Sequence, residues 1–240
     1  MCEPAVWKIE TGRDEMMIKG LAATAAMTLA AGASMGATVD LNYTGVAGGT
    51  SAAHLRVGSY VYYAGHMTHL YSGGARDGQV FNTFCIDVGE YATPGTATYQ
   101  IIDLEDAPIP GSPYGVVKAD AVSAVVANAI ALGWIGADLQ GDSGQAGYLG
   151  KMGAIQAAIW EALGFDVQVS SGSTSSSLKT YYAQLMSSTT FDSSLRTDGL
   201  KAVAASGQQD MLFIVPLPPA AFAGAGLLAA CFGVRNVRRR

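Results

Sequence analysis

The segment Val80-Phe-Asn-Thr-Phe-Cys-Ile-Asp-Val88 organises the interpretation of the whole sequence. Its apolar, aromatic and β-branched residues predict a strand, with Cys85 at the centre. The chain has two other cysteines, Cys2 and Cys231, and each lies in an end that we expect to be removed. A single thiol in an exported protein forms no internal disulfide, so it is inert, joins two chains or takes part in chemistry.

Short runs with strand character, separated by turns, fill the sequence from residue 38 to about residue 108. Alternating apolar and polar positions and paired glycines are typical of strands joined by tight turns. We expect strands over residues 39–43, 55–71 (broken at two glycines), 80–88 and 98–102, and a closing strand over residues 210–215.

A period of 3.6 residues replaces this pattern after the proline-rich segment 108–113. It predicts helices over residues 117–132 and 148–163, each followed by a glycine. Weaker helical patterns cover residues 178–186 and 195–205, and residues 170–177 form a polar, flexible loop by composition. The whole predicts an α+β domain, a β-sandwich or barrel-like domain with a helical insertion.

Charge limits the range of partners. Residues 38–219 contain 7 Lys and Arg against 15 Asp and Glu, a net charge of −8. Such a surface repels nucleic acid, and no basic stripe interrupts it. We therefore expect no nucleic-acid partner, and a segment of this length is enough for one hydrophobic core.

The N-terminal end has the three parts of a secretory signal. A lysine precedes an uncharged run over residues 21–33, which ends in small residues and is too short to span a bilayer comfortably. Residues 1–16 are acidic and do not fit a signal, but translation from Met16 or Met17 would account for them. We expect residues 1–37 to be an N-terminal extension and signal peptide, with an ordinary alanine-rich helix as the alternative.

The C-terminal segment, residues 215–240, begins with prolines, continues without charge and ends in arginines. The uncharged run over residues 220–234 predicts a membrane helix with its C-terminus in the cytoplasm. The prolines hold the chain extended just before it, which makes an accessible cleavage site. The motif itself consists of Val215, Pro216, Leu217 and Pro218.

This three-part tail resembles the PEP-CTERM class of sorting signals of Gram-negative bacteria, in its Val-Pro-Leu-Pro variant. Leu217 stands where the commonest form has glutamate. The resemblance implies recognition by an exosortase-type membrane enzyme and transient anchoring in the inner membrane through the C-terminal helix. It further implies removal of the tail and delivery to the cell surface or extracellular matrix. A plain anchor that is never cut is the alternative.

The helix expected over residues 148–163 turns a glutamine toward its apolar side. Successive residues differ by about 100°, which places Gln156 in an arc with Met152, Ile155, Ile159, Trp160 and Leu163. Ala154, Ala157 and Glu161 face the other way. A buried, unpaired amide costs roughly 1–3 kcal/mol, so Gln156 needs a partner. A backbone carbonyl or a buried water is one candidate.

A second candidate comes from the two motifs together. Thr83-Phe-Cys-Ile-Asp87 followed by Ala154-Ile-Gln-Ala-Ala-Ile-Trp-Glu161 resembles the Cys–Gln thioester domains of bacterial surface adhesins. The resemblance implies that Cys85 and Gln156 form a side-chain thioester, which an amine on a surface or matrix target opens. Ile155 departs from the threonine that adhesin domains often have before the glutamine.

Such a bond needs a dry surrounding. We expect Phe84, Ile155, Ile159 and Trp160 to provide it. The bond would close a 71-residue loop, and by analogy with a disulfide it would add about 4 kcal/mol of stability. The alternative is a buried free cysteine that packs as a small hydrophobe.

The histidines do not favour catalysis. His54, His66 and His69 all precede Cys85 on expected strands, and no peptidase motif surrounds the cysteine. We expect the three to be solvated. The acidic loop residues lack the spacing of an EF-hand, so neither a metal nor a cofactor is predicted.

The expectation is an exported surface protein that is not an enzyme, with residues 38–214 forming a thioester-like surface domain between the two processed ends. It acts as a covalent adhesin toward an amine-bearing surface or matrix target. The alternative is a structural or exopolysaccharide-associated biofilm-matrix protein in which Cys85 and Gln156 only pack. A hydrolase is a third and more distant option.

Overall fold

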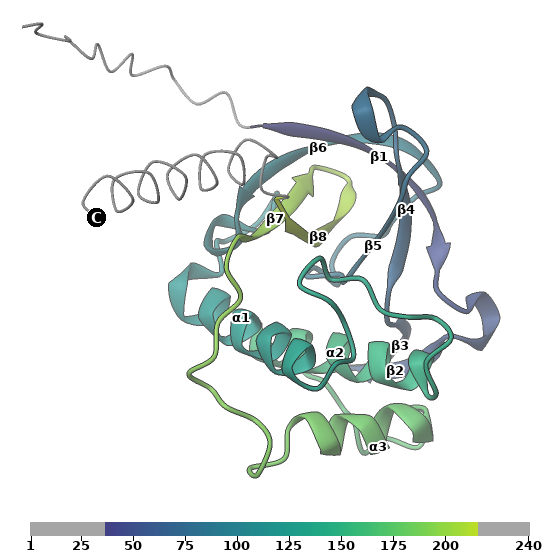
Figure 1. Cartoon of the computed structure of the whole chain (residues 1–240), viewed down its shortest axis with the longest axis vertical. Helices are drawn as coiled ribbons and strands as arrows, with labels where there is room; N and C mark the ends of the chain where they lie inside the picture. Colours follow the sequence, from purple (N-terminus) through teal and green to yellow (C-terminus); the bar gives the residue numbers. More distant parts are fainter. Residues whose placement is uncertain (1–36, 216–240) are drawn as a thin grey trace, which may run out of the picture. The chain divides into compact units, whose positions relative to one another are not determined.

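An antiparallel sheet and three helices make up residues 37–215, the part of the chain that this computed structural model describes (Figure 1). The mixture of helix and sheet confirms the expected α+β class. The signal peptide and most of the sorting segment, including Pro216, Leu217 and Pro218, lie outside these residues. The strands are β1 (Thr38–Val46), β2 (Ala53–Val57), β3 (Tyr60–Ala64), β4 (Met67–Tyr71), β5 (Val80–Thr83), β6 (Gly95–Asp103), β7 (Leu200–Ala205) and β8 (Gln208–Ile214), and the helices are α1 (Gly115–Ala131), α2 (Tyr148–Ala162) and α3 (Ser176–Leu185).

Six strands form the main sheet in the order β5-β4-β1-β6-β7-β8, and every neighbouring pair is antiparallel. The segment that follows β5 returns to β8. The N–H of Ile86 donates to the carbonyl of Asp210 (3.0 Å), and the N–H of Leu212 donates to the carbonyl of Phe84 (2.9 Å). Hydrogen bonds therefore join the two ends of the strand order, and Cys85 lies at this junction.

The helices are inserted in the chain between β6 and β7 and gather at one end of the sheet (Figure 1). Helix α2 is central, since it contacts α1, α3, β2 and β3. A Cβ on Gly153 would lie 2.7 Å from the Cβ of Ala53, so only glycine allows α2 to approach β2 this closely. Ala154 and Ala157, which were expected to face away from the core, are also buried because α2 is enclosed on both sides.

Two sequence-based expectations about elements are corrected. The pattern over residues 195–205 predicts a helix, but residues 200–205 form β7, which is paired on both sides with β6 and β8. Sheet pairing thus overrides the helical preference of alanine. The cysteine strand ends early, at Thr83, and Cys85 makes a single bridge to Met211 of β8.

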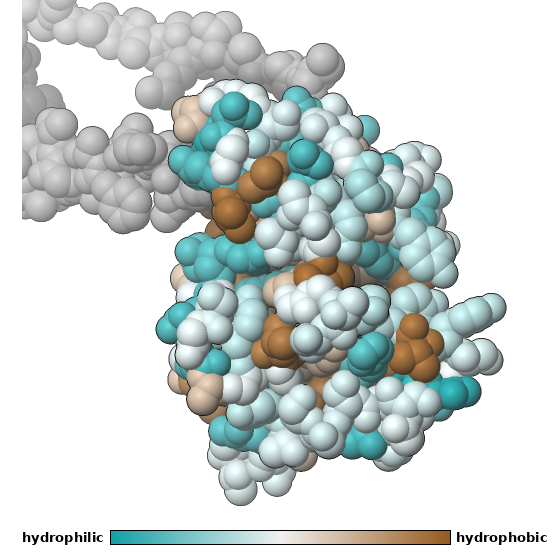
Figure 2. Space-filling view, turned by 90° about the vertical axis from the view of Figure 1, so that its right-hand side faces the viewer, coloured by the Kyte–Doolittle hydropathy of each residue, from teal (hydrophilic) through white to brown (hydrophobic). Residues whose placement is uncertain are grey.

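The serine-rich loop before α3 is attached to the small β2–β3 sheet. The N–H of His54 donates to Ser175 Oγ (2.8 Å), and the N–H of Arg56 donates to Thr174 Oγ1 (3.2 Å). On the face shown in Figure 2, apolar residues appear in small separate groups among polar ones. Among the described residues, no helix is both long and apolar enough to cross a membrane.

Candidate functional site

Cys85 and Gln156 are in direct contact although 71 residues separate them. The N–H of Cys85 donates to Gln156 Oε1 (2.9 Å), and Gln156 Nε2 donates to the carbonyl of Cys85 (2.7 Å). Both residues are buried, with 2% and 1% of their surface exposed. The side-chain amide of α2 therefore lies against the backbone of the cysteine.

The strand geometry explains why no neighbouring strand pairs with the backbone N–H and C=O of Cys85. Phe84 and Ile86 direct their backbone groups to β8, so those of Cys85 point to the opposite side, where β4 would continue. Strand β4 begins at Met67, which pairs with Thr83, and provides no partner beyond it. The carboxamide of Gln156 takes the place of the missing strand and satisfies both backbone groups.

The same two bonds meet the hydrogen-bonding needs of Gln156 itself. A backbone partner was one of the alternatives for this glutamine, and the observed partner is the backbone of Cys85. The carboxamide carbon is thus held beside the residue that carries the chain's described thiol. Packing and chemistry are both compatible with this contact.

The thiol of Cys85 is protonated at neutral pH. Burial is the largest cause and raises its pKa well above the usual range, and the nearby carboxylates of Asp87 and Asp210 raise it further. Contacts with the backbone of Asp87 and the indole of Trp160 oppose this shift. Sγ donates to the carbonyl of Asp87 (2.8 Å), so any reaction of the sulfur requires the loss of this proton.

A hollow of about 240 Å³ reaches the Cys85–Gln156 pair. Five of its thirteen lining residues are aromatic, and none is charged. Trp160 is part of the wall and meets Tyr62 edge to face, with ring centroids 5.8 Å apart. The lining consists of Tyr43, Val46, Val61, Tyr62, Tyr63, Gly65, Met67, Cys85, Tyr91, Ala92, Gln156, Trp160 and Gln209.

The other residues expected around the pair occupy a different place. Phe84, Ile155 and Ile159 are fully buried in the core cluster between the sheet and α1, and they do not line the hollow. The tyrosines that do line it were missed, because they come from strands and a loop that are far apart in the sequence. The only sequence signal was the density of tyrosine in β3.

The arrangement provides two things that acyl transfer needs: a sulfur nucleophile and a hydrogen-bond donor to the oxygen that becomes negative. Attack of Sγ on the carboxamide carbon would place negative charge on Oε1, and the N–H of Cys85 already donates to that oxygen. The C–S bond would form, the C–N bond would break, and the thiol proton would leave with the nitrogen as ammonia. The product would be a thioester between Cys85 and the former Gln156.

His66 and His69 are buried, contrary to the expectation that they are solvated. His66 Nδ1 hydrogen-bonds the hydroxyl of Tyr148 on α2 (2.8 Å), a partner 82 residues away. Burial lowers the pKa of both histidines to about 4, so both are neutral at pH 7. Neither lines the hollow, and within residues 37–215 no group of three or more His, Cys, Asp or Glu side chains is placed to hold a metal.

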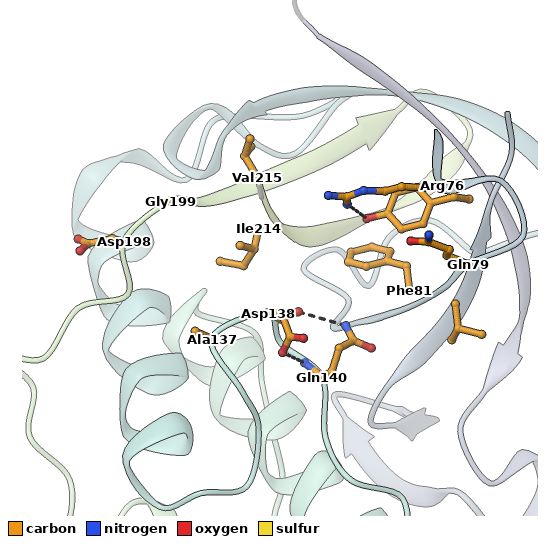
Figure 3. A pocket seen from close by; sticks show the side chains of 12 residues that line it. Arg76, Gln79, Phe81, Ala137, Asp138, Gln140, Asp198, Gly199, Ile214 and Val215 are labelled. Atoms are coloured by element: carbon orange, nitrogen blue, oxygen red, sulfur yellow. Dashed lines mark hydrogen bonds between the residues drawn. The ribbon is translucent and has the colours of Figure 1, made fainter. Parts of the chain in front are cut away.

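A second hollow, of about 500 Å³, lies between β5, the end of β8 and the loop before α2 (Figure 3). Tyr71 and Phe81 supply aromatic surface, and Arg76 donates to the Tyr71 hydroxyl (3.1 Å). At its edge the carboxamide of Gln140 pairs with Asn82, accepting from its N–H (3.2 Å) and donating to its carbonyl (2.9 Å).

Comparison of the chain with known protein families, with curated proteins and with solved structures found no match.

Proposed function

We propose that this chain is an exported bacterial surface protein and that its domain, residues 38–214, is a covalent adhesin. Cys85 and Gln156 form an internal thioester, and an amine on a surface or matrix target opens it. The observation that carries this proposal is that a Gln156 carboxamide only 1% exposed is held by two hydrogen bonds against a residue with a buried thiol, Cys85. The role is that of a binding protein, because each domain forms one bond and does not turn over.

Two further features support the reaction. The hollow gives an amine a path to the pair, while the burial of Cys85 and Gln156 limits access of water, which would otherwise hydrolyse the bond. The sheet, joined end to end beside Cys85, holds the cysteine backbone in a fixed position. A barrel-like domain with a helical insertion is the fold that this proposal assigns.

Export and sorting form a separate part of the proposal. Residues 1–37 carry the signal peptide, and residues 215–240 carry a PEP-CTERM-type signal with a membrane helix. An exosortase-type enzyme recognises Val215, Pro216, Leu217 and Pro218 and removes the tail. The expected result of replacing Pro216 and Pro218 with alanine is a larger, membrane-retained protein, measured by fractionation and intact mass.

Intact mass tests the thioester directly. Purified protein should be one ammonia lighter than its sequence, and incubation with methylamine should add one methylamine at Gln156 and free Cys85 for alkylation. Cys85→Ala should have the full sequence mass and take up no methylamine. A native protein of full sequence mass with no methylamine uptake would sink the proposal.

The second candidate is a matrix-associated protein without bond chemistry, and the hollow of Figure 3 favours it. Aromatic surface beside the polar side chains of Arg76, Gln79 and Asp138 is suited to a sugar ring, which presents apolar faces and hydroxyls. Retention of Cys85→Ala protein in an exopolysaccharide matrix, lost in Arg76→Ala, would select this function over the adhesin.

A further inference from the structure

One edge of strand β3 is unpaired beside the Cys85–Gln156 hollow. The β2–β3 sheet has only two strands, so β3 has a partner on one side alone. No hydrogen bond reaches the outer backbone groups of β3 from any other part of residues 37–215. The strand is Tyr60-Val-Tyr-Tyr-Ala64, without the lysine or proline that commonly protects a free edge.

The partners of β2 identify which groups are free. His54 and Arg56 bond the loop on the far side of β2, so their backbone groups point away from β3. Opposite residues share this orientation in antiparallel strands. Tyr63 faces His54 and Val61 faces Arg56, so the N–H and C=O of Val61 and Tyr63 point outward.

These free groups lie at the hollow itself. Val61, Tyr62 and Tyr63 all line it together with Cys85 and Gln156. The side chains of Val61 and Tyr63 are 46% and 50% exposed, so solvent reaches this edge. A strand laid along β3 would therefore lie beside residues that line the hollow.

We infer that the target reaches the site as an extended polypeptide segment that pairs with the outer edge of β3 and directs a lysine into the hollow. This inference rests on the proposed function, since the lysine is the amine that opens the thioester. A polypeptide is favoured over a saccharide because the free groups are two N–H and two C=O groups in strand spacing, which another strand complements. The net charge of −8 over residues 38–219 attracts a cationic side chain.

The bond chemistry balances with no other reagent. The neutral lysine amine attacks the thioester carbon, a C–N bond forms and the C–S bond breaks. The proton lost by the amine goes to the leaving sulfur, which restores the Cys85 thiol. Strand pairing contributes position, and it raises the local concentration of the amine at the carbon.

Two peptides test the inference on the full-length chain purified in detergent. One is an extended segment of alternating threonine and valine with a central lysine, and the other is the same sequence with alternate backbone nitrogens methylated. The unmodified peptide should couple to Gln156 at least about tenfold faster than the methylated one, which has lost its pairing N–H groups. Equal coupling rates would overturn the inference.

The protein side is tested by Val61→Pro, which removes an outward N–H and leaves the bonds to β2 in place. The rate of coupling of the lysine peptide should fall about tenfold more than the rate of free methylamine uptake, which reports the effect of the substitution on the hollow that Val61 lines. The matched control is Val80→Pro, at another exposed strand residue, which should leave both rates unchanged. Equal slowing of the two amines by Val61→Pro would overturn the inference, and if this variant fails to fold, the pair of peptides on the wild-type chain decides it.

A third measurement separates this inference from the thioester. In Cys85→Ala, which forms no bond, the lysine peptide should still shift the amide resonances of Val61 and Tyr63, and the methylated peptide should not. Absence of these shifts would overturn the edge pairing even if wild-type protein reacts with methylamine. Shifts in the protein alone that grow with its concentration would show that a second copy occupies the edge, which would also overturn the inference.

Discussion

Two glutamines pair with the backbone of the same segment, and they differ in almost everything else. Gln140 meets Asn82 within β5, and Gln156 meets Cys85 just beyond its end. Each carboxamide accepts from the N–H and donates to the C=O, so each replaces a missing strand. Gln140 lies at the rim of an open hollow, whereas Gln156 is 1% exposed and lies beside a thiol.

The difference between Gln140 and Gln156 shows how much the pairing of a carboxamide with a strand backbone can explain. Pairing of a glutamine with a strand edge is a structural solution that this fold uses twice, so the pairing by itself does not indicate chemistry. What sets Gln156 apart is its enclosure and the sulfur of its partner, since a water-shielded carboxamide beside a nucleophile can transfer its acyl group to that nucleophile. The same substitution made at Gln156 and at Gln140, with the same measurements, therefore separates packing from reaction.

The largest effect is expected from Gln156→Ala. The substitution leaves the buried N–H and C=O of Cys85 without partners, at about 1–3 kcal/mol each. The free energy of unfolding should fall by about 4 kcal/mol, measured by urea denaturation, and further where the thioester crosslink is also lost. If the double variant with Cys85→Ala is no less stable than Gln156→Ala alone, the two residues act as one unit. Independent, additive losses would argue for simple packing.

A second test uses acid and two buried histidines, His69 in β4, the strand beside β5, and His66 just before β4. His66 and His69 bind protons only near pH 4 when folded but at about pH 6.5 when unfolded. Between these values the unfolded chain holds more protons, so stability is full above pH 6.5 and is lost as pH falls toward 4. Asp210 contributes a pH dependence of stability with the opposite sign, which offsets that of one histidine. Burial raises its pKa to about 7, so its stabilising neutral form is lost as pH rises.

His69→Phe should reduce this acid sensitivity. His69 is buried against Tyr43 and Phe81, and its ring nitrogens have no partner among the described residues, so phenylalanine fits the surroundings. Relative to wild type, the variant should gain about 2 kcal/mol more at pH 4.5 than at pH 7. Urea denaturation at the two pH values measures this, and an equal gain at both would show that His69 is not the acid-sensitive group.

These residues also show where sequence reasoning succeeded and where it stopped. The inward position of Gln156 followed from the apolar arc of one helix, which is local information. The burial of His66 depends on Tyr148, 82 residues away, and the tyrosine walls of the hollow come from separate strands. No pattern along the chain contains such contacts.

The same distinction holds for the fold. Most strands and the helices α1, α2 and α3 follow from periodicity and glycine positions, which act over a few residues. Strand β7 does not, since Ala202 and Ala204 favour a helix until β6 and β8 bury them. The core that shields Gln156 was assigned to Phe84, Ile155 and Ile159 because motif neighbours were the only neighbours visible in the sequence.

The close approach of α2 to the β2–β3 sheet provides a further test of the difference between Gln156 and Gln140. Gly153→Ala places a methyl group 2.7 Å from the Cβ of Ala53, so α2 must move and carry Gln156 with it. We expect a loss of about 1–3 kcal/mol and slower methylamine uptake, with the Gln140 contact intact. Gly172→Ala, where nothing lies within 4 Å of the new methyl group, is the matched control. Unchanged methylamine uptake in Gly153→Ala would mean that the reactive position does not depend on this packing.

The smallest effect is expected at the counterpart glutamine. Gln140→Ala removes the same two bonds from Asn82, but water at the rim of the hollow can replace them, so the loss should be about 1 kcal/mol or less. Methylamine uptake should be unchanged, because Gln140 has no sulfur beside it. Thermal unfolding and intact mass measure both quantities on one sample. A loss as large as that of Gln156→Ala would show that strand replacement alone accounts for both residues, and the enclosure of Gln156 would then have no separate meaning.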